Sequence, residues 1–246
     1  MKYDLNINDF DPAKIRDFEQ KKIIESDNFL TVTRACGDAK HSSKMISIVG
    51  EPGYGKTSAL EYFAKITPGV FTLTVKKCMT AKVFYSTLLE RIGYTNRHKA
   101  NSIYHVIESI GYYLSQLQGN KLLIIDEAGK LSHQELLYLH DLWDAISSHT
   151  GVVLAGPNYF QSEIDRMVQQ GVVGLPELFR RITSWIELDQ PTVEEKKALF
   201  FEYGVINLKL LNSLARTPAI KTLDQVYSWI WEVGVAIRRL DNNGDL

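Results

Sequence analysis

The chain has 246 residues, 45% of them hydrophobic and 23% charged, which excludes a disordered segment or a coiled coil and suits one large domain with a small subdomain. Its 28 Lys and Arg residues nearly balance its 29 Asp and Glu residues. Because the net charge is -1, the chain is not a globally basic nucleic-acid binder, and any contact with DNA or RNA has to come from a local patch.

The cysteine pattern, and the lack of a recognisable signal peptide or membrane span, predict a cytoplasmic location. Cys36 and Cys78 are isolated and lack metal-site spacing, as expected for thiols in a reducing compartment. No apolar stretch approaches the roughly 20 residues that cross a bilayer, and the N-terminal residues lack the apolar core of a signal peptide. We therefore expect a cytoplasmic protein with no membrane partner.

In chain order, residues 1–28 mix charged and scattered apolar positions, which predicts a short helix and linker laid on the main domain. Short β-rich runs then alternate with segments of helical period. The predicted strands are residues 45–49, 70–75, 122–125, 152–155 and 185–188, and the predicted helices are residues 57–66, 81–92, 103–117 and 134–148, the last capped by Ser132 and Glu135. This alternation predicts an α/β domain over residues 29–190, in which helices cover a parallel sheet and ligands bind beyond the carboxyl ends of the strands.

At Pro191 the pattern changes. Proline ends the last strand, Thr192 can cap a new helix with Glu195 at the capping-box position, and the following residues as far as Leu240 have a helical pattern. We predict a small helical lid subdomain over residues 191–246, with a frayed C-terminal tail.

The most informative motif is the segment 50–57, which fits the phosphate-loop pattern G-x-x-x-x-G-K-[ST] between a predicted strand and a predicted helix. Backbone N–H groups of such a loop turn toward phosphates, Lys56 reaches the β and γ oxygens, and the Thr57 hydroxyl binds Mg²⁺. The N-terminus of the next helix adds partial positive charge. The motif predicts a nucleoside triphosphate held by Gly50, Pro52, Gly53, Tyr54, Gly55, Lys56, Thr57 and Ser58.

Two carboxylates follow the predicted strand 122–125. Asp126 would hold Mg²⁺ through its water shell, and Glu127 would polarise a water for in-line attack on the γ-phosphorus. An acidic pair can also simply begin a solvated turn. Beside a phosphate loop, it favours hydrolysis over transfer to a small acceptor.

Further polar residues follow later in the chain. Asn158 could place its amide between the attacking water and the γ-phosphate, or could only occupy a Pro-Asn turn. Arg180 and Arg181 precede the last strand, where one of them could reach a neighbouring subunit's nucleotide as an arginine finger, or both could lie in a solvated loop. In the helical subdomain, Arg238 and Arg239 could close on the γ-phosphate.

With these motifs the chain resembles the AAA+ ATPases over about residues 30–240. The segments 31–36, 122–129 and 154–156 look most like the transposition regulators typified by the phage Mu B protein and TnsC. The resemblance implies ATP as the nucleotide, a sheet order of 5-1-4-3-2, a site between subunits, and ATP-driven rings or helical filaments on DNA. It also implies a transposase and a targeting protein as partners. By the same resemblance, Asn158 is sensor 1, Arg180 or Arg181 the finger, and Arg238 or Arg239 sensor 2.

The segment 76–99 is the most basic part of the chain, with six Lys and Arg residues and one acid. Three lysines follow the second strand, and three more polar residues lie near the next helix start; in the resembling family these two regions line the DNA channel. We predict that they contact phosphates of duplex DNA with little sequence preference. The predicted DNA contacts are Lys76, Lys77, Lys82, Arg97, Lys99 and Asn101, although without the resemblance they could form a solvated basic face.

Two other functions stay open. A protein-remodelling or secretion-associated AAA+ ATPase of the ExeA type would not act on DNA and would leave the basic segment solvated. A small-molecule kinase would need an acceptor other than water, which the Asp126-Glu127 pair disfavours.

Overall fold

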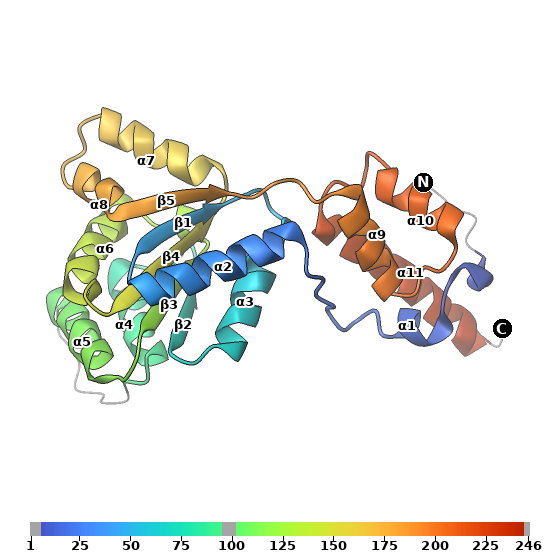
Figure 1. Ribbon diagram of the computed structural model, residues 1–246, viewed down its shortest axis with the longest axis horizontal. Coiled ribbons are helices and arrows are strands. Elements are labelled where there is room, and N and C mark those ends of the chain that lie inside the picture. Colours follow the sequence, from blue (N-terminus) through green and yellow to red (C-terminus); the bar gives the residue numbers. More distant parts are fainter. Residues whose placement is uncertain (1–5, 95–101, 244–246) are drawn as a thin grey trace. The chain divides into compact units, whose positions relative to one another are not determined.

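The computed structural model describes residues 6–94 and 102–243 and forms two compact units (Figure 1). The α/β unit consists of Leu30–Glu51 and Lys56–Leu188. The helical unit consists of the chain up to Phe29, the short segment Pro52–Gly55, and the chain from Asp189 onward.

The elements follow one another in a regular βα order within the α/β unit. They are η1 (Ile7–Asp9), α1 (Pro12–Arg16), α2 (Asp27–Ser42), β1 (Met45–Val49), α3 (Lys56–Ile66), β2 (Val70–Thr74), α4 (Ala81–Arg91), α5 (Ile103–Gln116), β3 (Lys121–Asp126), η2 (Ala128–Lys130), α6 (His133–Ile146), β4 (Thr150–Gly156), α7 (Tyr159–Gln169), α8 (Leu175–Arg181), β5 (Ile182–Glu187), α9 (Val193–Glu202), α10 (Leu208–Arg216) and α11 (Leu223–Asn243).

Five parallel strands form the sheet in the order β2-β3-β4-β1-β5, which confirms the predicted fold and strand order. Strands β1, β3 and β4 are buried along their whole length, as expected for a parallel sheet covered on both faces. In the register, Val49 of β1 lies opposite Gly156 of β4, and Leu154 of β4 lies opposite Ile125 of β3. The carboxyl ends of β1, β4 and β3 are therefore neighbours at one edge.

The two faces of the sheet have different helical partners. Alternate strand residues, such as Met45 and Val152, belong to a large core with α4, α5, α6 and α8. The intervening positions face α2, whose Ala39 carbonyl lies against the backbone of Gly151. Helix α2 was not predicted from the sequence, and it supplies the buried residues Val32, Cys36 and Ala39.

The N-terminal segment belongs to the helical unit. Phe10, Ile15 and Phe18 are buried in one core with residues of α9, α10 and α11. An isolated antiparallel bridge pairs Phe10 with Val205, and the Lys22 N–H donates to the Tyr203 hydroxyl (2.9 Å). The expectation that this segment lies on the main domain is wrong, because its aromatic side chains complete the core of the short C-terminal helices.

Two predicted helix starts are confirmed by their capping geometry. The Ser132 hydroxyl accepts the Glu135 N–H while the Glu135 carboxylate accepts the Ser132 N–H, and Thr192 and Glu195 repeat the arrangement at α9. Each box satisfies two N–H groups that a helix end would otherwise leave unpaired. None of the helices in the described part of the chain is long and apolar enough to span a membrane.

Candidate nucleotide site

The phosphate-loop threonine and the first carboxylate of the acidic pair meet at the carboxyl edge of the sheet. Thr57 lies in the first turn of α3, which follows β1, and Asp126 is the last residue of β3. The Thr57 hydroxyl donates to Asp126 Oδ2 (2.8 Å), and the Glu127 N–H donates to Asp126 Oδ1 (2.8 Å). Two residues far apart in the sequence therefore present oxygen atoms to one point.

The electrostatics of this point fit a bound cation. Burial raises the pKa of Asp126, although the hydrogen bonds from Thr57 and from the Glu127 N–H oppose the shift. A buried carboxylate gains from a nearby positive charge, and carboxylate and hydroxyl oxygens are ligands that Mg²⁺ accepts. Magnesium sites of this kind take the remaining ligands from water and substrate phosphates, so a pair of protein oxygens is sufficient.

Lys56 lies at the base of the phosphate loop. Its ammonium donates to the carbonyls of Gly50 (2.6 Å) and Glu51 (3.0 Å). These two hydrogen bonds hold the positively charged Lys56 ammonium at the start of the phosphate loop, directly after β1.

Replacing Lys56 with alanine should strongly weaken nucleotide binding. An ammonium that contacts phosphate oxygens contributes charge-assisted hydrogen bonds of about 1.5–3 kcal/mol, so we expect the dissociation constant for ATP to rise roughly 100-fold. Titration calorimetry of Lys56→Ala against wild type measures the change. Lys65→Ala, at the exposed end of α3, is the control and should bind as wild type does; equal affinity in the two variants would refute the assignment.

The tip of the phosphate loop needs glycine at two places. Gly53 and Gly55 have φ angles of +82° and +88°, a region that L side chains rarely adopt. A Cβ atom at Gly53 would also lie 2.8 Å from Thr222 Cβ, just before α11. Within the same helical unit the Leu223 N–H donates to the Gly53 carbonyl (3.0 Å).

Glu127 has an uncommon backbone conformation for a residue with a side chain. Its φ and ψ are 59° and 34°, in the left-handed region, and strained residues of this kind concentrate at functional sites. Its carboxylate pairs with the Lys130 ammonium at 3.1 Å, across the single turn of η2, and both side chains are about half exposed. The turn directs Glu127 beyond the end of β3.

Asn158 lies two residues past β4, between the ends of β1 and β3 in the strand order. Its Oδ1 atom is buried and has no hydrogen-bond partner among the described residues. Pro157, just before it, packs closely on Gly129 of η2, where a Cβ would lie 2.9 Å from the proline ring. An unpaired buried amide oxygen in this place is available to a ligand or a water.

The family comparison agrees with this geometry. The model of the family described as AAA domain matches residues 39–163, about half of the chain, which includes the phosphate loop, Asp126, Glu127 and Asn158. The chain belongs to the AAA domain family. No curated protein matches its sequence.

Several solved structures share the fold of this AAA protein. The Aeropyrum pernix ORC2 protein, in its ADPNP-ADP complexes, is 13% identical with a TM-score of 0.66 over 96% of this chain and 68% of that one. The Pyrobaculum aerophilum Cdc6p structure is 13% identical, with a TM-score of 0.65 over 98% and 67%. The Aeropyrum pernix ORC1 protein in complex with DNA is 15% identical, with a TM-score of 0.61 over 91% and 64%. At these identities the matches establish the fold alone.

The two predicted finger arginines lie at the opposite edge of the sheet of this AAA domain. They are the last residues of α8 and not part of a loop, because α8 continues up to the start of β5. Arg181 donates to Asp144 of α6 (3.2 Å), with His140 3.8 Å from the same carboxylate. Arg180 is exposed, and no partner for it is found within the described residues.

The structure does not bring Arg238 to the phosphate loop. Its guanidinium donates to Glu19 (2.9 Å), lies 4.6 Å from the centre of the Phe18 ring, and lowers the pKa of Glu19. Arg238 is fifteen positions beyond Leu223 in α11, which corresponds to about 22 Å along a helix. Arg239 is exposed beside it.

Of the predicted DNA contacts, the lysines after β2 lie close to the nucleotide site. The Val75 N–H donates to the Asp126 carbonyl (2.9 Å), and Lys76 and Lys77 follow directly and are exposed. Lys82 is exposed in the first turn of α4. The other predicted contacts, Arg97, Lys99 and Asn101, lie outside the described residues.

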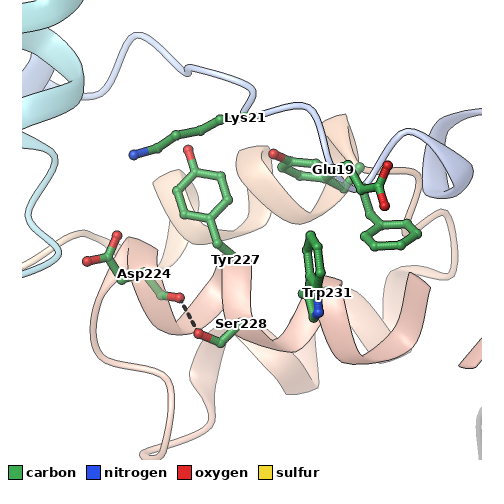
Figure 2. Close-up of a pocket in the computed structure, with 8 residues that line it drawn as sticks. Glu19, Lys21, Asp224, Tyr227, Ser228 and Trp231 are labelled. Carbon is green, nitrogen blue, oxygen red and sulfur yellow. Dashed lines mark hydrogen bonds between the residues drawn. The ribbon is translucent and has the colours of Figure 1, made fainter. Parts of the chain in front are cut away.

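A separate surface pocket of about 370 Å³ lies in the helical unit and contains none of the predicted site residues (Figure 2). Figure 2 shows Tyr227 and Trp231 projecting from α11, with Lys21 lying over the Tyr227 ring. The lining residues are Phe18, Glu19, Lys21, Tyr203, Asp224, Tyr227, Ser228 and Trp231.

Sequence reasoning missed Asn28, at the start of α2. Its Nδ2 donates to the carbonyls of Tyr54 (3.3 Å) and Asp189 (2.7 Å), and its Oδ1 accepts the Asp189 N–H (3.2 Å). No motif or spacing marks this residue. It ends a run of polar residues, 25–28, and nothing in that run distinguishes it from its neighbours.

Proposed function

We propose that this protein is an ATPase that binds duplex DNA through the phosphate backbone and assembles on it in the ATP-bound state. The nucleotide part rests on one observation: Thr57, Asp126, Glu127 and Asn158 gather at one edge of the sheet, where the phosphate loop begins. These are the groups that a phosphoryl transfer to water requires.

Each residue has a distinct role in the proposed hydrolysis. Mg²⁺, held through Thr57 and Asp126, would neutralise charge on the phosphate oxygens. Glu127 accepts a proton from the attacking water as its oxygen approaches the γ-phosphorus. Asn158 offers its unpaired amide oxygen to the same water and so orients it. Lys56 stabilises the negative charge that the β and γ oxygens share.

The proposed arginine finger is Arg180. Arg181 is held by Asp144, whereas Arg180 is exposed. Both precede β5, and the six residues of that strand span about 20 Å, so Arg180 lies at the amino edge of the sheet, away from Asp126. It can therefore complete only the site of another subunit, which is why we propose a homo-oligomer, as a ring or a helical filament.

The proposed DNA contact begins with Lys76 and Lys77. Both are exposed directly after the strand that pairs with β3, so a phosphate backbone that contacts them passes near the acidic pair. The structural neighbours include an ORC1 protein in complex with DNA and a DnaA protein bound to AMPPCP and single-stranded DNA. These two neighbours support the proposal that this AAA domain also acts on DNA.

The salt dependence of binding tests the DNA contact. We expect a fluorescent 30-base-pair duplex to bind more tightly with ATP and Mg²⁺ than without, and to lose affinity steeply between roughly 50 and 200 mM salt. In the double variant Lys76→Gln/Lys77→Gln the slope of log affinity against log salt should become shallower by about 2 per subunit, with ATP affinity unchanged.

The double variant Lys40→Gln/Lys44→Gln is the matched control, because Lys40, near the end of α2, and Lys44 both precede β1 and so lie toward the other edge of the sheet. It should keep the wild-type slope. A DNA affinity that changes neither with ATP nor with salt concentration would contradict the proposal. A complete lack of DNA retention would instead favour a protein-remodelling ATPase of the ExeA type.

Within this function, we propose the narrower role of a transposition regulator that selects target DNA and recruits a transposase. The motif flanks at 31–36 and 154–156 support this role. Stimulation of a transposase encoded beside this protein, dependent on ATP and DNA, would test it. If no transposase gene lies beside the gene for this protein, the transposition role loses its support, while the proposed ATPase activity on DNA does not.

A further inference from the structure

Two carbonyls at the tip of the phosphate loop are bound from outside the motif. The Gly53 carbonyl accepts the Leu223 N–H (3.0 Å), and the Tyr54 carbonyl accepts Asn28 Nδ2 (3.3 Å). All four residues belong to the helical unit. The nucleotide motif itself explains neither donor.

Asn28 is held firmly in place. The residue is 8% exposed, and its side chain makes three hydrogen bonds, two donated and one accepted. Because the backbone of Asp189 both donates to and accepts from the same amide, the side chain has one orientation that satisfies every bond. The Nδ2 atom therefore holds the Tyr54 carbonyl at a fixed place.

The geometry of the peptide bond carries this restraint into the loop. In a planar trans peptide the C=O and the following N–H point in opposite directions, and the described chain contains no cis peptide. Fixing the Tyr54 carbonyl toward Asn28 therefore directs the Gly55 N–H away from Asn28. By the same rule, the bond from Leu223 directs the Tyr54 N–H away from the start of α11.

We propose that Asn28 is a positioning residue for phosphate binding, which turns the Gly55 N–H into the loop before the nucleotide arrives. The Leu223 amide does the same for the Tyr54 N–H. Successive N–H groups that point into one concavity bind phosphate oxygens, and a loop oriented in advance loses less entropy on binding. This inference rests on the proposed nucleotide site.

The test compares Asn28→Asp and Asn28→Ala with wild type. Aspartate keeps the size of the side chain and the acceptor for the Asp189 N–H, but it cannot donate to the carbonyls of Tyr54 and Asp189. We expect both variants to bind the ATP analogue AMPPNP about tenfold more weakly by calorimetry. The affinity for inorganic tripolyphosphate, which has no base or sugar, should fall by the same factor. Asn120→Asp is the matched control, because Asn120 also donates to a backbone carbonyl, that of His41, but is exposed.

The outcomes separate this inference from the function beneath it. If the wild-type protein does not bind AMPPNP, the proposed function itself is contradicted. Wild-type binding with an unchanged affinity in Asn28→Asp would overturn only the role of Asn28. A purely structural role predicts a lower unfolding temperature with unchanged affinity for tripolyphosphate below it, and that result would also overturn the proposal.

Discussion

Glu127→Gln should bind ATP as tightly as wild type and hydrolyse it about 100- to 10,000-fold more slowly, which is the usual contribution of a general base. Glutamine keeps the shape of the side chain but cannot accept the proton of the attacking water. The backbone at Glu127 is set by the turn into η2, which both side chains can occupy, so the loop should keep its conformation. Single-turnover phosphate release measures the chemical step directly, and calorimetry measures the affinity.

Glu61→Gln provides the control for this prediction. Glu61 is exposed on α3, the helix that begins at the phosphate loop, but it lies outside the acidic pair. It should hydrolyse ATP at the wild-type rate. A Glu127→Gln protein with a rate within a factor of about two of wild type would exclude Glu127 as the base. If the proposed assembly is correct, the slow variant should also remain on DNA longer than wild type.

The sequence predicted the sheet well because each strand is a short apolar run and the phosphate loop fixes which run is β1. The position of Asp126 follows from the same logic, since it comes directly after an apolar run that is followed by two consecutive acids. Helix α2 was missed for a physical reason. Thr31, Val32 and Thr33 are β-branched and Gly37 is flexible, so the local helix propensity is low, and burial against the sheet stabilises the helix instead.

The parts of the site that escaped prediction depend on pairs that are distant in sequence. Asp144 holds Arg181 across 37 positions, and Glu19 holds Arg238 across 219. No spacing rule connects such residues, because their contact exists only after the helices have packed. Asn28 is of the same kind, since it contacts both Tyr54 of the phosphate loop and Asp189, two residues past β5. A sequence motif identifies the residues that contact the ligand. The residues that position them are distant in the sequence and are found only in the folded structure.

Gly151→Ala should destabilise the protein more than any surface change. A Cβ atom at this position of β4 would lie 2.1 Å from the Ala39 carbonyl oxygen and 2.6 Å from its carbon, both in the backbone of α2. The same carbonyl already accepts the Lys44 N–H (3.1 Å), so the end of α2 cannot move without breaking the turn into β1. Overpacking against rigid backbone costs about 3 kcal/mol, which corresponds to roughly 6–12 °C in the unfolding temperature of a chain of this size. Thermal unfolding monitored by circular dichroism measures the shift.

Gly37→Ala is the matched control and should change stability in the opposite direction. Gly37 lies in the middle of α2, and a Cβ atom there would meet nothing within 4 Å. Within a helix, alanine is more favourable than glycine by roughly 0.5–1 kcal/mol, so this variant should unfold at a slightly higher temperature. Both substitutions add one methyl group, and their opposite signs would show that the close approach of α2 to β4, and not the loss of glycine as such, sets the cost. Equal unfolding temperatures for the two variants would mean that α2 does not pack on the sheet in this way.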